Sequence, residues 1–90
     1  MTSENIKNEL IKLVSELFQD KGIDPDLIEY VDLIDDLGME SIIFISMILE
    51  IEKRFEIIIP DEICVMENFN SMHNIVWLLS NIIKNEGDRE

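Results

Sequence analysis

Apolar residues recur at the spacing of an α-helix in three separate stretches, and this pattern limits the fold of the chain most strongly. It predicts helices over residues 4–18, 41–55 and 71–84. Each helix would turn an apolar face inward and a polar face outward, as the helices of a small bundle do. The inward positions are Ile6, Leu10, Leu13, Val14 and Leu17 in the first helix, Phe44, Met47, Ile48, Ile51 and Phe55 in the second, and Met72, Ile75, Val76, Leu79, Ile82 and Ile83 in the last.

The segments between these helices are also rich in apolar residues. Residues 23–40 form a long connection that we expect to lie against the bundle, since long loops of small domains are seldom without a role. A short third helix is predicted over residues 60–67, because Pro60 suits the first position of a helix. The isoleucines at 57–59 have no partner strand and should form an extended loop that plugs the core. The predicted fold is an all-α four-helix bundle with a long first connection and a short third helix.

Length and charge exclude several classes of protein. The 90 residues suffice for one domain, which we expect over residues 1–85 with a polar C-terminal tail over 86–90. The formal net charge of −13 repels phosphate backbones and anionic lipids, which excludes nucleic-acid and membrane binding and indicates partners with basic surfaces. A single cysteine excludes an internal disulfide, and the first residues do not resemble a signal peptide. We therefore expect a cytoplasmic monomer.

The residue inventory excludes most catalytic sites. His73 is the only histidine, so neither a catalytic triad nor a multi-histidine metal site can form. Cys64 lies between apolar residues and is expected in the core, and Trp77 is expected to pack half covered by the first helix. The acidic residues around Asp32 lack the ligand spacing of a calcium-binding loop. We expect no enzyme activity and no dedicated metal site.

One segment suits covalent modification. Ser41 stands where a loop becomes a helix, directly after Glu40 and three residues after Gly38. The N-terminus of a helix favours an anion, and glycine allows a tight turn beside the hydroxyl. These features suit a serine that carries a phosphodiester, flanked by carboxylates at Asp35 and Asp36. Residue types alone favour the alternative that Ser41 only caps the helix.

Three blocks of the sequence resemble acyl and peptidyl carrier proteins. Residues 36–42 (DLGMESI) are similar to the attachment motif D-x-G-x-D-S-L of that family. Residues 50–62 (EIEKRFEIIIPDE) resemble its E-x-x-F-[DE]-[IV]-x-I-P-x-E pattern, and residues 69–75 (FNSMHNI) resemble the entry to its last helix. Each block is weak alone, but together they stand in the family's order and spacing over nearly the whole chain.

The resemblance implies a function for Ser41. It implies a four-helix carrier domain, without catalysis of its own, whose serine bears 4′-phosphopantetheine derived from coenzyme A; Asp36, Gly38 and Glu40 would support the site. A phosphopantetheinyl transferase would attach the group. Loading and downstream biosynthetic enzymes would then act on an acyl or aminoacyl thioester.

Two departures from the family pattern refine this interpretation. Glu40 replaces the usual Asp or His before the serine, which keeps the charge on a longer side chain. The positions after Ser41 are apolar where fatty-acid carriers commonly have acidic residues, which favours a stand-alone carrier of a dedicated pathway, such as polyketide or nonribosomal peptide synthesis. Ile42, Ile45 and Leu49 form a second apolar stripe on the helix over 41–55, either covered by the long connection or exposed to partner enzymes; we expect partner contacts at Ile42, Ile45, Leu49, Asp35 and Glu50.

Two other functions remain as alternatives. An acidic helical interaction module without a covalent cofactor would explain the net charge but not the three blocks. A small hydrolase would need a base that the chain lacks.

Overall fold

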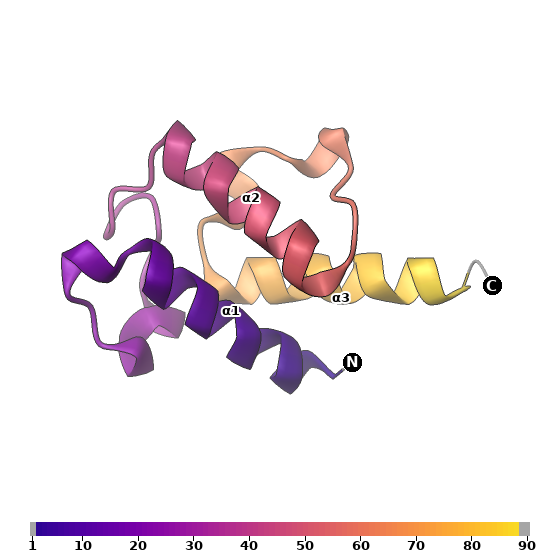
Figure 1. Ribbon diagram of the computed structural model, residues 1–90, viewed down its shortest axis with the longest axis horizontal. Coiled ribbons are helices and arrows are strands. Elements are labelled where there is room, and N and C mark those ends of the chain that lie inside the picture. Colours follow the sequence, from indigo (N-terminus) through magenta and orange to yellow (C-terminus); the bar gives the residue numbers. More distant parts are fainter. Residues whose placement is uncertain (1, 89–90) are drawn as a thin grey trace.

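The computed structural model describes the backbone of residues 2–88 and the side chains of residues 2–85. Along this part of the chain lie three α-helices, α1 (Ser3–Leu17), α2 (Ser41–Phe55) and α3 (Met72–Asp88), and no strand (Figure 1). The three long helices predicted from the apolar spacing are confirmed to within one residue, except that α3 continues four residues past the predicted end at residue 84. Residues 89 and 90 of the predicted tail lie outside the described residues.

Side-chain hydroxyls cap two of the three long helices. The Thr2 hydroxyl accepts a hydrogen bond from the backbone N–H of Asn5 (3.2 Å) at the start of α1. The Ser71 hydroxyl accepts one from the backbone N–H of Asn74 (3.2 Å) at the start of α3. In each case the cap satisfies a backbone N–H that has no partner inside the helix.

The long connection lies against the bundle, as predicted. A short 3₁₀ helix, η1 (Gln19–Lys21), precedes it and ends at Gly22 in the left-handed conformation (φ 68°), and a second, η2 (Pro25–Tyr30), lies within it. The segment η2 packs on α1 and α3. The connection contributes four fully or nearly fully buried side chains to the core: Ile28, Leu33, Leu37 and Met39.

The predicted short helix over residues 60–67 is replaced by two 3₁₀ turns, η3 (Asp61–Ile63) and η4 (Met66–Phe69). Between them Cys64 adopts φ −82° and ψ 62°, and the Val65 N–H donates to the Ile63 carbonyl at 2.9 Å. This is an inverse γ-turn, which interrupts a helix. The side-chain amide of Asn68 also donates to the Ile63 carbonyl (3.0 Å) and satisfies the acceptor that a continuous helix would have used.

The segment over residues 57–59 is extended and enters the core, as predicted. Ile57 and Ile59 are buried, whereas Ile58 between them is exposed, because successive side chains of an extended chain point to opposite sides. The Glu52 carboxylate holds this segment by accepting a hydrogen bond from the Ile59 N–H at 2.8 Å. The extended segment thus fills the space at the end of α2 without forming a sheet.

One apolar core joins all these elements. The helix α1 packs on both α2 and α3, and the rings of Phe44 and Phe69 meet with centroids 5.6 Å apart. Phe44 belongs to α2 and Phe69 to η4, so this contact closes the core between elements that are distant in sequence. The five α2 positions predicted to face inward are all buried: Phe44, Met47, Ile48, Ile51 and Phe55.

Two side chains are more exposed than expected: Trp77, which was predicted to be half covered by the first helix, and Cys64, which was predicted in the core. Trp77 is 63% exposed, because it stands two positions from both Ile75 and Leu79 and so lies on the opposite side of α3 from these core residues. Cys64 is only half-buried, because the γ-turn places it between the two 3₁₀ turns at the surface. Desolvation of its side chain still raises the pKa of the Cys64 thiol, which keeps it protonated and unreactive near neutral pH.

Candidate functional site around Ser41

Ser41 is the first residue of α2, and its side chain is exposed. The capping position belongs to Glu40, whose backbone is extended (φ −114°, ψ 173°) and whose carbonyl accepts the first helical hydrogen bond, from the Phe44 N–H at 2.8 Å. No side chain caps this helix. The alternative that Ser41 only caps α2 is therefore wrong, and its hydroxyl is left accessible.

The N–H groups at the start of α2 suit an anion. The backbone N–H groups of Ser41, Ile42 and Ile43 precede the first helical hydrogen bond and have no partner inside the helix. Together with the positive end of the helix dipole, they favour a negative group attached at this end. A phosphodiester on the Ser41 oxygen would therefore meet unpaired donors beside it.

The loop that leads to Ser41 is ordered by two carboxylates. One oxygen of Asp32 accepts hydrogen bonds from the N–H groups of Ile34 (2.8 Å) and Asp35 (2.7 Å). The Asp36 carboxylate in turn accepts one from the Asp32 N–H at 2.8 Å. Asp36, predicted as a supporting residue, thus acts locally by closing a turn. The hydrogen bonds that hold Asp32 in its ionised form lower its pKa, the one from Asp35 most strongly.

Asn70 ties this loop to the start of α3. Its side-chain amide donates a hydrogen bond to the second carboxylate oxygen of Asp32 at 3.0 Å. Its backbone carbonyl accepts a hydrogen bond from the Leu33 N–H at 2.7 Å. Its side-chain oxygen accepts from the Asn74 amide at 2.8 Å. Sequence reasoning did not single out Asp32 or Asn70 for this role. An acid four residues before a second acid, Asp32 and Asp36, was the one local sign of a carboxylate-capped turn.

Gly38 turns the chain just before the helix. It adopts the left-handed conformation (φ 69°), which residues with a Cβ rarely adopt, and open space surrounds the place where a Cβ would stand. Leu37 and Met39 on either side are buried, so the glycine is the exposed tip between two anchored side chains. The N–H of Gly38 donates to the Ile34 carbonyl at 3.0 Å, and that of Met39 donates to the Leu33 carbonyl at 2.9 Å.

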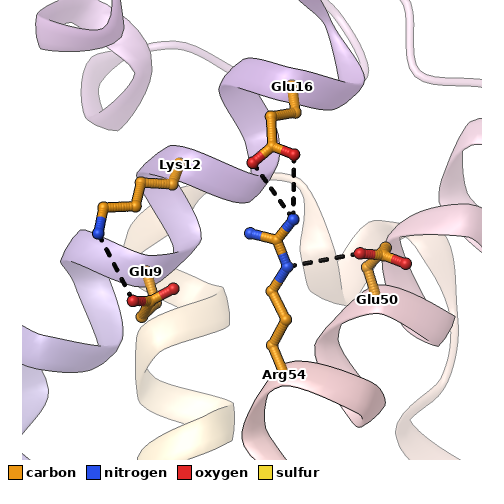
Figure 2. Close-up of polar contacts among 5 residues, drawn as sticks. All are labelled: Glu9, Lys12, Glu16, Glu50 and Arg54. Atoms are coloured by element: carbon orange, nitrogen blue, oxygen red, sulfur yellow. Dashed lines mark hydrogen bonds and ion pairs between the residues drawn. The ribbon is translucent and has the colours of Figure 1, made fainter.

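The acidic residues predicted to meet partners divide into two groups. Asp35 and Glu40 are exposed, and Glu40 directly precedes Ser41. Glu50 instead pairs with Arg54 one turn further along α2 (3.4 Å), as Figure 2 shows. The same Arg54 donates two hydrogen bonds to Glu16 of α1 (3.1 and 3.2 Å) and so bridges the two helices. Glu50 is therefore engaged inside the molecule, whereas Asp35 and Glu40 form no ion pair with another described residue.

The second apolar stripe of α2 is exposed. The exposed fractions of Ile42, Ile45 and Leu49 are 79%, 56% and 60%. The sequence left open whether the long connection covers these side chains, and in the structure it does not. The stripe begins next to Ser41 and runs along the outer side of α2, opposite its buried residues.

Neither a metal site nor a membrane-spanning helix is present in the described part of the chain. It contains no group of three or more His, Cys, Asp or Glu side chains arranged to hold a metal ion. None of the helices in residues 2–88 is both long and apolar enough to cross a membrane.

Comparison with known proteins identifies the family. The family model described as the phosphopantetheine attachment site matches residues 9–72, which include Ser41 and the loop before it. The chain belongs to this family of carrier proteins. Its members bear a 4′-phosphopantetheine group and do not catalyse reactions themselves, so the chain is a carrier protein and not an enzyme. As a carrier it works with phosphopantetheinyl transferases and biosynthetic enzymes.

Named carrier proteins are similar over most of their length. Aminoacyl carrier protein 2 of Bradyrhizobium diazoefficiens is 26% identical over 80 residues, which cover 89% of each chain. Aminoacyl carrier protein 1 of the same organism is 27% identical over 71 residues, or 79% of this chain and 78% of that protein. An acyl carrier protein of Bdellovibrio bacteriovorus is 33% identical over 52 residues, or 57% of this chain and 67% of that protein.

Proposed function

We propose that Ser41 bears the 4′-phosphopantetheine group of this carrier protein. The observation that carries the proposal is the position of its hydroxyl, which is exposed at the first residue of α2 and is not used to cap the helix. The residues around it fit the group, because the free N–H groups of the first helical turn favour the phosphodiester. No base is needed beside Ser41, because the transferase supplies the chemistry of attachment.

The neighbouring residues would hold the serine in place and would not react. Gly38 permits the left-handed turn that exposes the loop tip, and Asp36 closes the turn before it. Glu40 occupies the capping position with an exposed carboxylate that a basic partner can reach. These are the supporting roles that the family resemblance implies for the three residues.

We further propose that the protein is a stand-alone carrier of a dedicated, secondary-metabolite type of pathway. The bound group supplies a terminal thiol that holds an acyl or aminoacyl cargo as a thioester. The apolar residues after Ser41 support a role outside housekeeping fatty-acid synthesis. The names of the two similar Bradyrhizobium proteins favour an aminoacyl cargo between the two classes.

Partner enzymes would approach the Ser41 end of α2. The exposed stripe of Ile42, Ile45 and Leu49 offers an apolar contact, and Asp35 and Glu40 attract basic side chains at its start. Glu50 would contribute to this contact only by exchanging its intramolecular partner. The net charge of −13 disfavours self-association, which supports a monomer, and a single free cysteine is compatible with the cytoplasm.

Loading with coenzyme A tests the assignment of Ser41. The protein is incubated with coenzyme A, magnesium and a broad-specificity phosphopantetheinyl transferase, and intact mass is measured. We expect a gain of one phosphopantetheinyl mass, its loss in Ser41→Ala, and an unchanged gain in Ser46→Ala, which removes a second serine from α2. Loading of Ser41→Ala would contradict the proposal. Absence of loading in a folded wild-type protein would favour the acidic interaction module instead.

A further inference from the structure

Ile58 is an isoleucine that the fold turns outward. It is 78% exposed, whereas its neighbours Ile57 and Ile59 are buried. The backbone fixes this arrangement, because successive side chains of an extended chain point to opposite sides and the two neighbours fill the core. The side chain of Ile58 therefore stays in water, and its apolar surface is available to another molecule.

Glu52 holds Ile58 beside the exposed stripe of α2. The Glu52 carboxylate accepts a hydrogen bond from the Ile59 N–H at 2.8 Å, and the Glu52 carbonyl accepts one from the Ile57 N–H at 3.2 Å. The chain is thus tied to Glu52 on both sides of Ile58. Glu52 follows Leu49 by three residues, and residues at this spacing are neighbours on a helix surface. Ile58 therefore continues the stripe past Leu49.

The turn at the end of α2 makes this placement possible. Glu56 adopts the left-handed conformation (φ 54°) at the C-cap, which ends the helix and changes the direction of the chain. The following residues then pass beside the last turns of α2 (Figure 1). An exposed side chain in this segment thus becomes part of the surface of α2.

The stripe and Ile58 together form one apolar surface, the extended stripe. Its four aliphatic side chains are all more than half exposed: Ile42, Ile45, Leu49 and Ile58. The helix beneath it has 15 residues and is about 22 Å long. A single exposed aliphatic residue is ordinary, whereas a row of them along one helix is typical of a protein contact site.

The transferase that modifies Ser41 has the right size to cover this surface. A standard interface buries about 800 Å² on each partner, which is a patch about 30 Å across. An enzyme that reaches the start of α2 with such an interface extends to the far end of the helix. Residues 40–62 contain six carboxylates against two cations, so the surroundings of the stripe favour an enzyme with basic groups, even though the exposed Lys53 is one of the cations.

We propose that Ile58 is a contact residue for the phosphopantetheinyl transferase and that Glu52 is the positioning residue that holds it there. The inference rests on the proposed attachment at Ser41. Ile58 lies beyond the opposite end of α2 from that hydroxyl, so its contact is the same before and during transfer. Such a contact contributes to affinity and leaves the chemical step unchanged.

Steady-state loading tests the role of Ile58. The intact protein is varied in concentration with coenzyme A, magnesium and a phosphopantetheinyl transferase, and loading is followed by intact mass. Ile58→Ser should raise the KM for the carrier about tenfold, because an aliphatic contact is lost, with kcat unchanged. The matched control is Leu27→Ser, which removes an exposed aliphatic side chain from η2 and should keep the wild-type KM.

Three further variants test the role of Glu52. Glu52→Ala removes the acceptor for the Ile59 N–H and should raise the KM about threefold. Glu52→Gln removes the same charge but keeps an oxygen acceptor, and it should restore a KM near that of the wild type. If Glu52 acts through Ile58, the double variant Glu52→Ala with Ile58→Ser should have the KM of Ile58→Ser alone.

Each contrary outcome has a distinct meaning. A wild-type KM in Ile58→Ser, with normal loading at Ser41, would overturn this inference alone and leave the attachment site intact. Loss of self-association in that variant, again with an unchanged KM, would assign the extended stripe to a second copy of the chain. Equal KM values for Glu52→Ala and Glu52→Gln would show that charge acts and not the hydrogen bond. Absence of loading in the folded wild type would overturn the assignment of Ser41 and this inference with it.

Discussion

The side-chain amide of Asn70 donates a hydrogen bond to the Asp32 carboxylate at 3.0 Å, across 38 positions of sequence. Asp32 opens the turn that leads to Ser41, and Asn70 stands just before α3. The backbone carbonyl of Asn70 also accepts a hydrogen bond from the Leu33 N–H at 2.7 Å. This pair therefore sets the position of the Ser41 loop relative to the last helix, which neither segment determines alone.

Removal of the Asn70 side chain should affect loading more than folding. Asn70→Ala removes the side-chain hydrogen bonds to the Asp32 carboxylate and from the Asn74 side-chain amide, but keeps the backbone hydrogen bond from Leu33. We expect a loss of about 1–2 kcal/mol in the free energy of unfolding, as for a lost side-chain hydrogen bond, and slower transfer of phosphopantetheine. Asn68→Ala is the matched control, because it removes a different side-chain hydrogen bond, from the Asn68 amide to the Ile63 carbonyl. Equal transfer rates for the two variants would show that Asn70 does not position the serine loop.

The stabilising effect of Asp32 should disappear in acid. The pKa of Asp32 is lowered in the folded protein, so its contribution is present above the unfolded pKa of about 4 and is lost as the pH falls through the folded value. Asp32→Asn should therefore show a shallower loss of stability below about pH 4 than the wild type. Asp20→Asn removes the same charge from an exposed site and should follow the wild type. Urea unfolding across a pH series measures all three, and identical acid profiles for Asp32→Asn and the wild type would contradict the prediction.

The two apolar stripes of α2 should respond differently to a charge. Ile48 is buried, so Ile48→Asp should cost about 3 kcal/mol or more, as an unpaired charge in a core does. Ile45→Asp and Leu49→Asp introduce the same group at exposed positions and should leave the melting temperature nearly unchanged while slowing loading or acyl transfer. Thermal melts and transfer assays provide the comparison. Normal transfer by both surface variants would remove the stripe from the proposed docking surface.

Charge at the serine should control the rate of association with the transferase. Asp35→Lys with Glu40→Lys reverses two exposed charges in the segment before Ser41 and should lower kcat/KM for loading, most strongly at low salt, because screening weakens steering. Asp61→Lys with Glu62→Lys makes the same change in net charge beyond the other end of α2 (Figure 1) and should have a smaller effect. If both pairs reduced the rate equally, net charge and not the local carboxylates would govern the encounter.

The end of α2 contains a residue in an unfavourable conformation. Glu56 adopts the left-handed region (φ 54°), and its N–H donates to the Glu52 carbonyl to close the helix. Glycine adopts this conformation readily, so Glu56→Gly should raise the free energy of unfolding by about 1 kcal/mol. Glu56→Gln removes the charge but keeps the side chain, and it separates the two effects in chemical denaturation. A gain as large in Glu56→Gln would attribute the stabilisation to charge instead.

The sequence by itself determined the helices and the inward side of each one. The spacing of Phe44, Met47, Ile48, Ile51 and Phe55 was sufficient because a helix repeats its faces every 3.6 residues, whatever packs against it. The sequence alone also indicated the carrier-protein family, because the three blocks that resemble that family are defined by local residue order. Ser41 could be placed at the start of α2 for the same reason.

Tertiary structure decided what lies on each surface and what holds the Ser41 loop. The exposure of Trp77 and of the stripe beginning at Ile42 depends on where other segments pass, and helical spacing contains no information on that path. The pairs Asn70–Asp32 and Arg54–Glu16 each join residues 38 positions apart, so no local pattern could indicate them. Long-range contacts of single polar groups form only once the core has set the distances between helices, and for that physical reason the sequence alone did not reveal them.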